Sequence, residues 1–227
     1  RMAEDSENAL AVAQSLDDQH EAAAERADLA ALRAALAALA AGTHRQASSL
    51  ELDARTDQLH AAAATGDLAA LCAALAAGAD VEARTNDSYT RTPLARVVDP
   101  QKSISDERRT ACVRALLLAG ASPSAPIESH GGRSCWMPLH DAAFLGLYTV
   151  CRLLLDAGAD VNARHMMLSG KYYTPLYYAA TRQPTLERAE RNQKAIALLL
   201  SRGAVDGPEV DKYESSSYLK KIRAAGG

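Results

Sequence analysis

Hydrophobic positions in this chain recur in four related blocks: a short apolar turn, a Leu-rich stretch, and then Gly-Ala. In each Leu-rich stretch the apolar residues return at helical spacing, so they line one face of a helix. A glycine follows at the point where such a helix ends, because positive φ costs glycine little. These closing glycines are Gly78, Gly120, Gly158 and Gly203. The pattern predicts four pairs of helices that must stack, since no pair can bury its apolar face alone.

The first helix of each pair has a recognisable start. Three of the four blocks place a proline directly before a leucine, and two of these prolines follow a threonine. The first turn of a helix tolerates a missing N–H, and threonine is a favourable N-cap. We therefore expect Thr92 and Thr174 to cap helices, and Pro93, Pro138 and Pro175 to begin them.

The same positions carry a repeated phrase. The third block reads Pro138-Leu139-His140-Asp141-Ala142-Ala143, and the fourth reads Thr174-Pro175-Leu176-Tyr177-Tyr178-Ala179-Ala180. Thr-Pro-Leu-His-x-Ala, repeated at about 33 residues, is typical of ankyrin repeats, and the chain resembles that family from about residue 53 to residue 206. The resemblance implies an all-α fold: an ankyrin-repeat solenoid of paired antiparallel helices that binds protein partners rather than transforming them.

The resemblance also implies structural roles for the motif histidines. In that family this histidine hydrogen-bonds the backbone between repeats, so His60 and His140 are expected to do so. Ala95 and Tyr177 stand at the same place in the other two repeats. At those two junctions, other residues must therefore hydrogen-bond the backbone groups that the histidine would otherwise bind.

The four repeats are not equally long. The second and fourth are about seven residues longer between the motif leucine and the closing glycine than the first and third. The added stretches, near 99–109 and 183–192, are polar and each contains a proline, so we expect solvent loops or extended second helices. The connections between repeats also exceed what a period of about 33 residues leaves for them. They should form long finger loops that project from one face.

These patterns divide the chain into three parts. Residues 1–50 are an Ala-rich N-terminal helical cap, either a worn repeat or an unrelated helical hairpin, in which a leucine stripe predicts one helix. Residues 51–208 hold the ankyrin repeats, and residues 209–227 form a C-terminal cap and tail with a short helix near 215–223. The repeats are expected at about 53–84, 86–125, 131–163 and 168–206.

Composition narrows the class of partner and the expected cellular location of the protein. The net charge is −3 and no Lys/Arg cluster occurs, which argues against nucleic-acid binding. Charged residues interrupt the Ala-rich N-terminal run, so no membrane insertion is expected. No signal peptide pattern is present, which favours a cytoplasmic location, although Arg1 before Met2 leaves a removed leader open. The Ala-rich and Arg-rich composition favours a bacterial source, and the unbound chain is expected to be a monomer.

Candidate chemistry is sparse. The four cysteines show no C-x-x-C spacing, so a zinc site is not expected, and Cys112 and Cys151 lie among apolar residues as small buried side chains. Only Cys135, His140 and Asp141 resemble a nucleophile with a base, and His140 already has a structural role in the family. No phosphate-binding glycine loop or hydrolase motif occurs. We predict no catalytic residues, no metal and no cofactor.

Aromatic residues point to a binding surface instead, because nine of the ten lie after residue 130. In ankyrin repeats, positions at fixed offsets from the motif leucine face the concave groove. The resemblance thus implies partner-binding residues at Tyr89, Arg91, Arg133, Trp136, Phe144, Lys171, Tyr173 and Arg182. Aromatic and arginine side chains dominate interface energies, so the partner should present acidic and apolar groups. In the first repeat the same offsets give only small or polar residues, at Asp53, Ala54, Thr56, Ala64 and Thr65.

Three function classes remain open. The leading one is a protein-binding module that acts as an inhibitor, an immunity protein or an adaptor. The second is a structural protein that assembles through its N-terminal helices, and an enzyme is the least favoured. For Trp136 and Phe144 taken singly, filling a gap in the fold is the alternative to binding.

Overall fold

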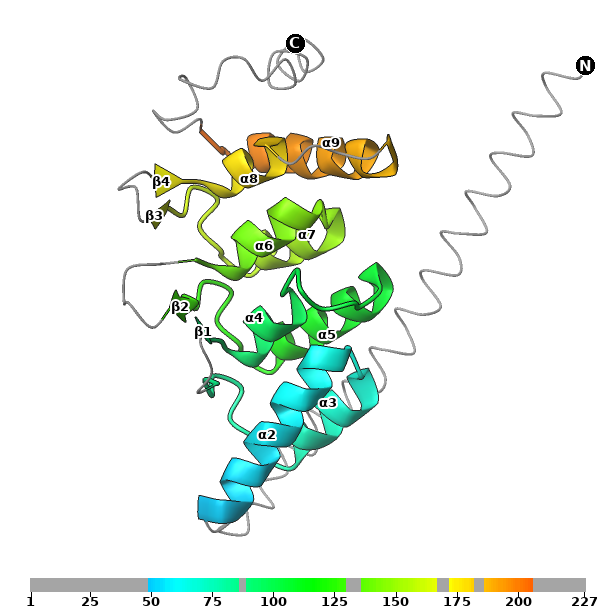
Figure 1. Cartoon of the computed structure of the whole chain (residues 1–227), viewed down its shortest axis with the longest axis vertical. Helices are drawn as coiled ribbons and strands as arrows, with labels where there is room; N and C mark the ends of the chain where they lie inside the picture. Colours follow the sequence, from blue (N-terminus) through cyan, green and yellow to red (C-terminus); the bar gives the residue numbers. More distant parts are fainter. Residues whose placement is uncertain (1–48, 86–88, 130–135, 167–171, 182–185, 206–227) are drawn as a thin grey trace, which may run out of the picture.

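The structure, a computed structural model, describes residues 49–85, 89–129, 136–166, 172–181 and 186–205 (Figure 1). The helices in this part of the chain are α2 (Ser49–Thr65), α3 (Leu68–Ala76), α4 (Pro93–Val97), α5 (Asp106–Leu118), α6 (Pro138–Leu145), α7 (Tyr148–Asp156), α8 (Pro175–Thr181) and α9 (Leu186–Ser201). The short strands are β1 (Tyr89–Thr90), β2 (Glu128–Ser129), β3 (His165–Met166) and β4 (Tyr172–Tyr173). The helices form four consecutive pairs.

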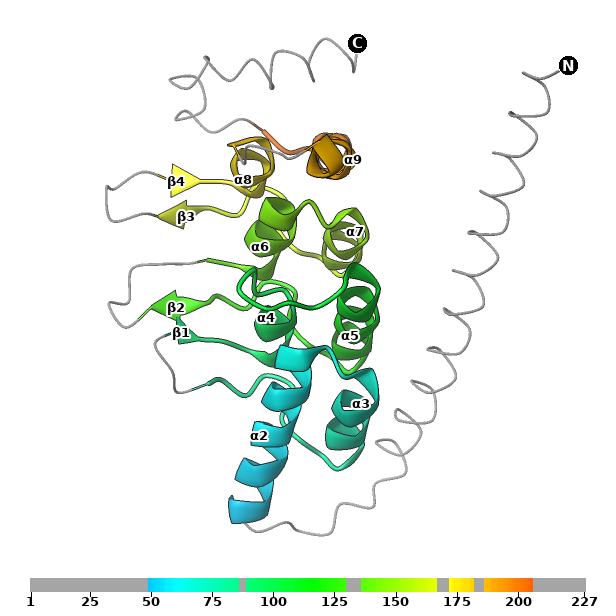
Figure 2. The ribbon, with the colours of Figure 1, turned by 45° about the vertical axis from the view of Figure 1, so that its right-hand side comes forward.

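The pairs stack in two layers. The first helices, α2, α4, α6 and α8, form an inner layer that lies between the strands and the second helices (Figure 2). Helix α2 packs against α4 and α6 packs against α8, while α3, α5, α7 and α9 pack one after another in the outer layer. The predicted all-α repeat solenoid is confirmed.

A continuous row of leucines forms the core. One leucine from each helix is at most 1% exposed: Leu59, Leu71, Leu94, Leu116, Leu139, Leu154, Leu176 and Leu199. Each fully buried leucine contributes roughly 1.5–3 kcal/mol through the apolar surface it removes from water. The row crosses every junction between repeats, so stacking itself builds the core.

Helix starts and ends follow the sequence signals. The Thr92 hydroxyl accepts a hydrogen bond from the Ala95 N–H at 3.3 Å, and the Thr174 hydroxyl accepts one from the Tyr177 N–H at 3.3 Å. The four closing glycines all have positive φ, between 85° and 95°. The predicted caps and helix ends are therefore confirmed.

In the short repeats the inner helix ends in a tight turn on a left-handed glycine. Gly66 and Gly146 have φ values of 66° and 70°. The chain then folds back so that the backbone N–H of Asp67 donates to the Ala62 carbonyl, and the N–H of Leu147 donates to the Ala142 carbonyl, both at 3.0 Å. These bonds supply a donor to carbonyls that have no hydrogen-bond partner within the helix.

In the long repeats a side chain replaces that backbone donor. Counted back from the closing glycine, Arg109 and Asn192 occupy the position that Asp67 and Leu147 hold in the short repeats. Arg109 donates through Nη1 to the Val97 carbonyl, and Asn192 donates through Nδ2 to the equivalent carbonyl, that of Ala179, at 3.3 Å. A polar side chain at this position thus lets a repeat carry an insertion while the carbonyl near the end of its inner helix still accepts a hydrogen bond.

The second repeat shows both forms that were expected for the insertions. Residues 99–105 form an irregular loop, and α5 has 13 residues against nine in α3 and α7. Helix α9 is longer still, at 16 residues. The polar ends of the first insertion are not solvated, however, because Asp99 is 2% and Arg109 3% exposed. That part of the expectation was wrong, since both side chains are used inside the fold.

The connections between repeats project from one side of the stack as short β-paired fingers (Figure 1). Strand β1 pairs antiparallel with β2 of the next connection, and β3 pairs with β4 within one connection. An isolated bridge joins Ile127 to Trp136 at the base of the middle finger. In the first repeat, Asp53 to Thr56 lie inside helix α2. In this repeat, helix α2 therefore takes the place of a finger.

Candidate functional site

Seven rings from the third and fourth repeats meet where the fingers join the inner helices. Strand β3, strand β4 and helices α6 and α8 supply them, together with the residue at the base of the middle finger. We call this group the aromatic cluster. It consists of Trp136, His140, Phe144, His165, Tyr173, Tyr177 and Tyr178.

Tyr178 lies at the centre of the aromatic cluster. Its ring centroid is 4.6 Å from that of Trp136, 6.4 Å from Phe144 and 6.1 Å from Tyr173. Tilted and edge-to-face pairs at these separations each add about 0.5–1.5 kcal/mol beyond the area that they bury. The cluster is therefore held in one arrangement before any partner arrives.

The rings differ in how much surface they offer. Trp136, Phe144, Tyr177 and Tyr178 are partly exposed. Tyr173 and His165 are only 8% and 5% exposed, so they support the others from beneath. The partly exposed rings form an aromatic surface on the inner face, by which we mean the surface between the fingers and the inner helices.

His140 fixes the base of the aromatic cluster. Its Nδ1 accepts a hydrogen bond from the Met137 N–H at 3.2 Å, which leaves the proton on Nε2 to donate to the Ala163 carbonyl at 3.2 Å. His60 makes the corresponding bond between Nε2 and the Ala83 carbonyl at 3.0 Å. The predicted structural role of the motif histidines is confirmed. Complete burial lowers the pKa of His140 to about 4, so it is neutral at pH 7.

A second hydrogen bond ties the finger to the inner helix. Nδ1 of His165, on β3, lies 2.8 Å from the hydroxyl oxygen of Tyr178, on α8. Burial lowers the pKa of His165 and raises that of Tyr178, so both groups are neutral at pH 7. This bond holds the Tyr178 ring against Trp136.

Tyr89 and Arg91 form a separate pair in the second repeat. The Arg91 guanidinium carbon lies 4.8 Å from the centroid of the Tyr89 ring, a cation–π contact. Arg91 also pairs with Asp99 at 3.8 Å, and its side chain is only 13% exposed. Tyr89 is 45% exposed. The ring of Tyr89 is thus available to a partner, whereas most of the Arg91 charge is used inside the protein.

Buried charges join the second repeat to the third. Asp141 of α6 is 4% exposed and interacts with Arg91, Arg109 and Asp99 of the second repeat. Burial raises the pKa of Asp141 well above its ordinary value, while the two arginines and the Trp136 indole N–H act against that rise. Breaking such a group by removing one partner is strongly destabilising. These residues therefore stabilise the junction between the second and third repeats.

The structure brings some of the expected binding residues together and leaves others apart. Trp136, Phe144 and Tyr173 meet around Tyr178, while Tyr89 and Arg91 form their own pair one repeat away. Arg133, Lys171 and Arg182 lie outside the described residues. Trp136 packs against three other rings, so it also fills space inside the fold.

The cysteines in the described part of the chain offer no reactive thiol in the core. Cys112 and Cys151 are completely buried, as expected, and burial raises the pKa of Cys151 to about 12. Among the described residues no group of three or more His, Cys, Asp or Glu side chains could hold a metal ion. Cys135 lies outside the described residues. No helix in that part of the chain is both long and apolar enough to cross a membrane.

Three residues of the aromatic cluster were not predicted to take part in binding: Tyr177, Tyr178 and His165. Tyr177 was noted only as the residue in place of the motif histidine. Tyr178 occupies the variable position of the Thr-Pro-Leu-His-x-Ala phrase, so the motif itself could have indicated that it lies beside the groove. His165 carried no such signal. Its place depends on the register of β3 and β4, in which it pairs with Tyr173.

The paired helices, the stacked leucine core and the β-paired fingers define a helical-repeat protein with a preformed surface between fingers and inner helices. Residues 59–165 match the family model for ankyrin repeats, in three copies. Residues 59–165 are therefore ankyrin repeats. The α8–α9 pair follows the matched segment as a fourth helix pair. Ankyrin repeats are generally protein–protein interaction modules and are typically not enzymes.

Proposed function

We propose that this chain captures one protein partner on its inner face, over the aromatic cluster and the exposed ring of Tyr89. The observation that carries this proposal is the arrangement of partly exposed rings around Tyr178, which buried His165 and Tyr173 support. A surface already fixed in one arrangement loses little conformational freedom when it binds, and that favours affinity.

The chemistry of this surface indicates the chemistry of the partner. Partly exposed aromatic rings favour apolar and aromatic contacts, so the partner should present apolar side chains over Phe144 and Tyr178. Acidic groups are expected at the edge, because Arg96 lies on the second repeat and the expected residues Arg133, Lys171 and Arg182 are also basic. An inhibitor, an immunity protein or an adaptor would each use such a surface.

Self-assembly through the N-terminal helices is the alternative. It rests on the Ala-rich, Leu-striped segment within residues 1–50. Sedimentation at several protein concentrations separates the two functions. A monomer at all concentrations supports capture of a different protein, whereas a concentration-dependent assembly supports the alternative.

Two tyrosines on the fingers give a matched test of the inner face. Tyr89 is 45% exposed and contacts Arg91, while Tyr172 is 49% exposed and precedes Tyr173 in β4. Because neighbouring residues of a strand point to opposite faces, Tyr172 points away from the aromatic cluster that Tyr173 joins. Both can be changed to alanine with little effect on folding.

The partner is first isolated by affinity capture from the source cells and identified by mass. Calorimetric titration should then show that Tyr89→Ala weakens binding by about 1–2 kcal/mol, as expected for an aromatic interface residue. Tyr172→Ala should bind within about 0.5 kcal/mol of the unchanged chain. Equal losses for both variants, or a loss for Tyr172→Ala alone, would place the partner elsewhere.

A further inference from the structure

The unequal repeat lengths produce a notch at the end of the stack opposite the fingers. Repeats two and four are long and repeat three, between them, is short, so its turn is recessed. Two adjoining cavities of about 340 and 220 Å³ open over that turn. Both are lined by Asp106, Leu147 and Arg191. We call this feature the turn notch.

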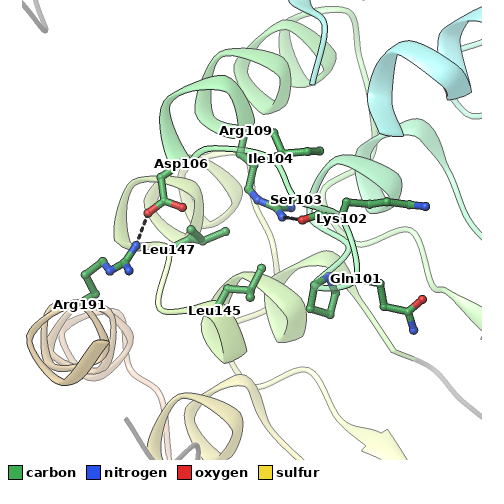
Figure 3. A pocket seen from close by; sticks show the side chains of 10 residues that line it. Gln101, Lys102, Ser103, Ile104, Asp106, Arg109, Leu145, Leu147 and Arg191 are labelled. Carbon is green, nitrogen blue, oxygen red and sulfur yellow. Dashed lines mark hydrogen bonds and ion pairs between the residues drawn. The ribbon is translucent and has the colours of Figure 1, made fainter. Parts of the chain in front are cut away.

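The first wall of the turn notch is the loop at residues 99–105, which two contacts hold in place. Arg109 donates to the Lys102 carbonyl at 2.5 Å, and Ile104 packs onto the turn of the first repeat. At that turn a Cβ on Gly66 would lie 2.5 Å from Ile104 Cγ2, so only glycine permits this approach. Figure 3 shows Arg109 reaching the Lys102 carbonyl behind the loop.

The second wall is the first part of α9, and it is held in the same way. Asn192 is 1% exposed and packs against Gly146, where a Cβ would lie 2.1 Å from its Oδ1. Across the notch, Arg191 pairs with Asp106 at 2.6 Å (Figure 3). Both walls are therefore fixed by packing, as in binding sites that exist before their ligand arrives.

The lining combines an apolar floor with an excess of positive charge. Leu145 and Leu147 form the floor from the short turn between α6 and α7. Arg191 pairs with Asp106, and Lys102 and Lys194 add two further positive charges to the lining of the two cavities. Such a surface is complementary to a segment in which carboxylates alternate with apolar side chains.

We propose that the turn notch is a second protein-binding site, which receives a short acidic and apolar segment of a partner protein. Its elongated form favours an extended segment, because the two cavities adjoin at Leu147. The notch lies at the opposite end of the helices from the fingers, which carry His165 and Tyr173, so one chain can hold two proteins at once. This distinguishes an adaptor from a simple inhibitor.

The test uses the full chain labelled with ¹⁵N and a short peptide in which Asp and Glu alternate with Leu. We expect the amide signals of residues 101–106, 147–150 and 191–194 to shift on titration, while the indole signal of Trp136 stays in place. The counterpart peptide, with Lys in place of Asp and Glu, should cause no saturable shift.

Reversing two positive charges in the notch tests whether they bind the acidic peptide. Arg191→Glu together with Lys194→Glu should lower peptide affinity at least about tenfold, and Arg152→Glu, at an exposed position of α7 outside the notch, should leave it within about twofold. These side chains are exposed, so the variants keep the fold, which thermal melting checks. Tyr89→Ala should not change peptide binding, and that separates this site from the inner face. Absence of shifts, shifts at Trp136 and Tyr173, or equal binding of the basic peptide would each overturn the proposal.

Discussion

At the scale of single residues, the inner face depends on hydrogen bonds made by histidine and tyrosine side chains, which burial keeps uncharged. His140 uses both ring nitrogens on backbone groups, and His165 holds the hydroxyl of Tyr178. A protonated His140 would lose its acceptor at Nδ1, so the Met137 N–H would be left unpaired in the interior. Acid should therefore loosen the base of the aromatic cluster.

The first prediction follows from the pKa of His140, which is about 4 in the folded chain against 6.5 for the free side chain. The unfolded state binds the proton first, so stability is full above pH 6.5 and falls as the pH drops towards 4. The linked loss is about 3 kcal/mol. Urea unfolding between pH 7 and 4 measures it.

His140→Gln is the comparison for that prediction, because glutamine does not titrate. The difference in stability between the two proteins should shrink by about 3 kcal/mol from pH 7 to pH 4. Asp141 acts in the opposite sense, since its raised pKa makes stability fall as the pH rises, but both proteins carry it. Parallel pH profiles would show that His140 is not protected from protonation in the fold.

The second prediction concerns Arg109, which donates to the carbonyls of Val97, Asp99 and Lys102. Arg109→Ala should destabilise the chain by about 3–5 kcal/mol, because it leaves these carbonyls without a donor and removes one of the two arginines near the buried Asp99. The neighbouring Arg108 is exposed, so Arg108→Ala should cost less than about 0.5 kcal/mol. Similar melting of the two variants would contradict the role of Arg109 as a substitute for the backbone donor.

At the scale of elements, the sequence was most informative where a position has a local physical cause. Thr92, Pro93 and Gly120 act within a few residues of themselves, so the ends of their helices were predictable. The long insertions were located, but the burial of Asp99 and Arg109 was not foreseen. That burial depends on a carbonyl of α4 which only the folded repeat brings within reach of α5.

The third prediction tests the packing of the outer layer. Leu154 of α7 is completely buried, so Leu154→Ala should destabilise by about 2–5 kcal/mol through lost burial and a cavity. Leu118, near the end of α5, is 49% exposed, and Leu118→Ala should cost less than about 1 kcal/mol. Chemical denaturation compares them. A larger loss for Leu118 than for Leu154 would mean that the outer helices present different faces to the core.

At the scale of the whole molecule, the stack presents two different ends. The finger end carries most of the aromatic cluster and the turn end carries the notch, and the regular leucine row between them supports the loops at both ends. The aromatic clustering after residue 130 was visible in the sequence. The convergence of Trp136, Phe144 and Tyr173 on Tyr178 was not, since it combines two repeats and one strand register.

The most direct test of capture on the inner face uses Trp136, which is the single tryptophan of the chain and lies 4.6 Å from the rings of Tyr178 and His165. The full chain is titrated with the isolated partner, itself produced with its tryptophans replaced by phenylalanine, while the emission of Trp136 is recorded. We expect a saturable shift of that emission to shorter wavelength, with the same dissociation constant that calorimetry gives, because the partner removes water from the partly exposed indole. Calorimetric binding with unchanged Trp136 emission would contradict capture over the aromatic cluster.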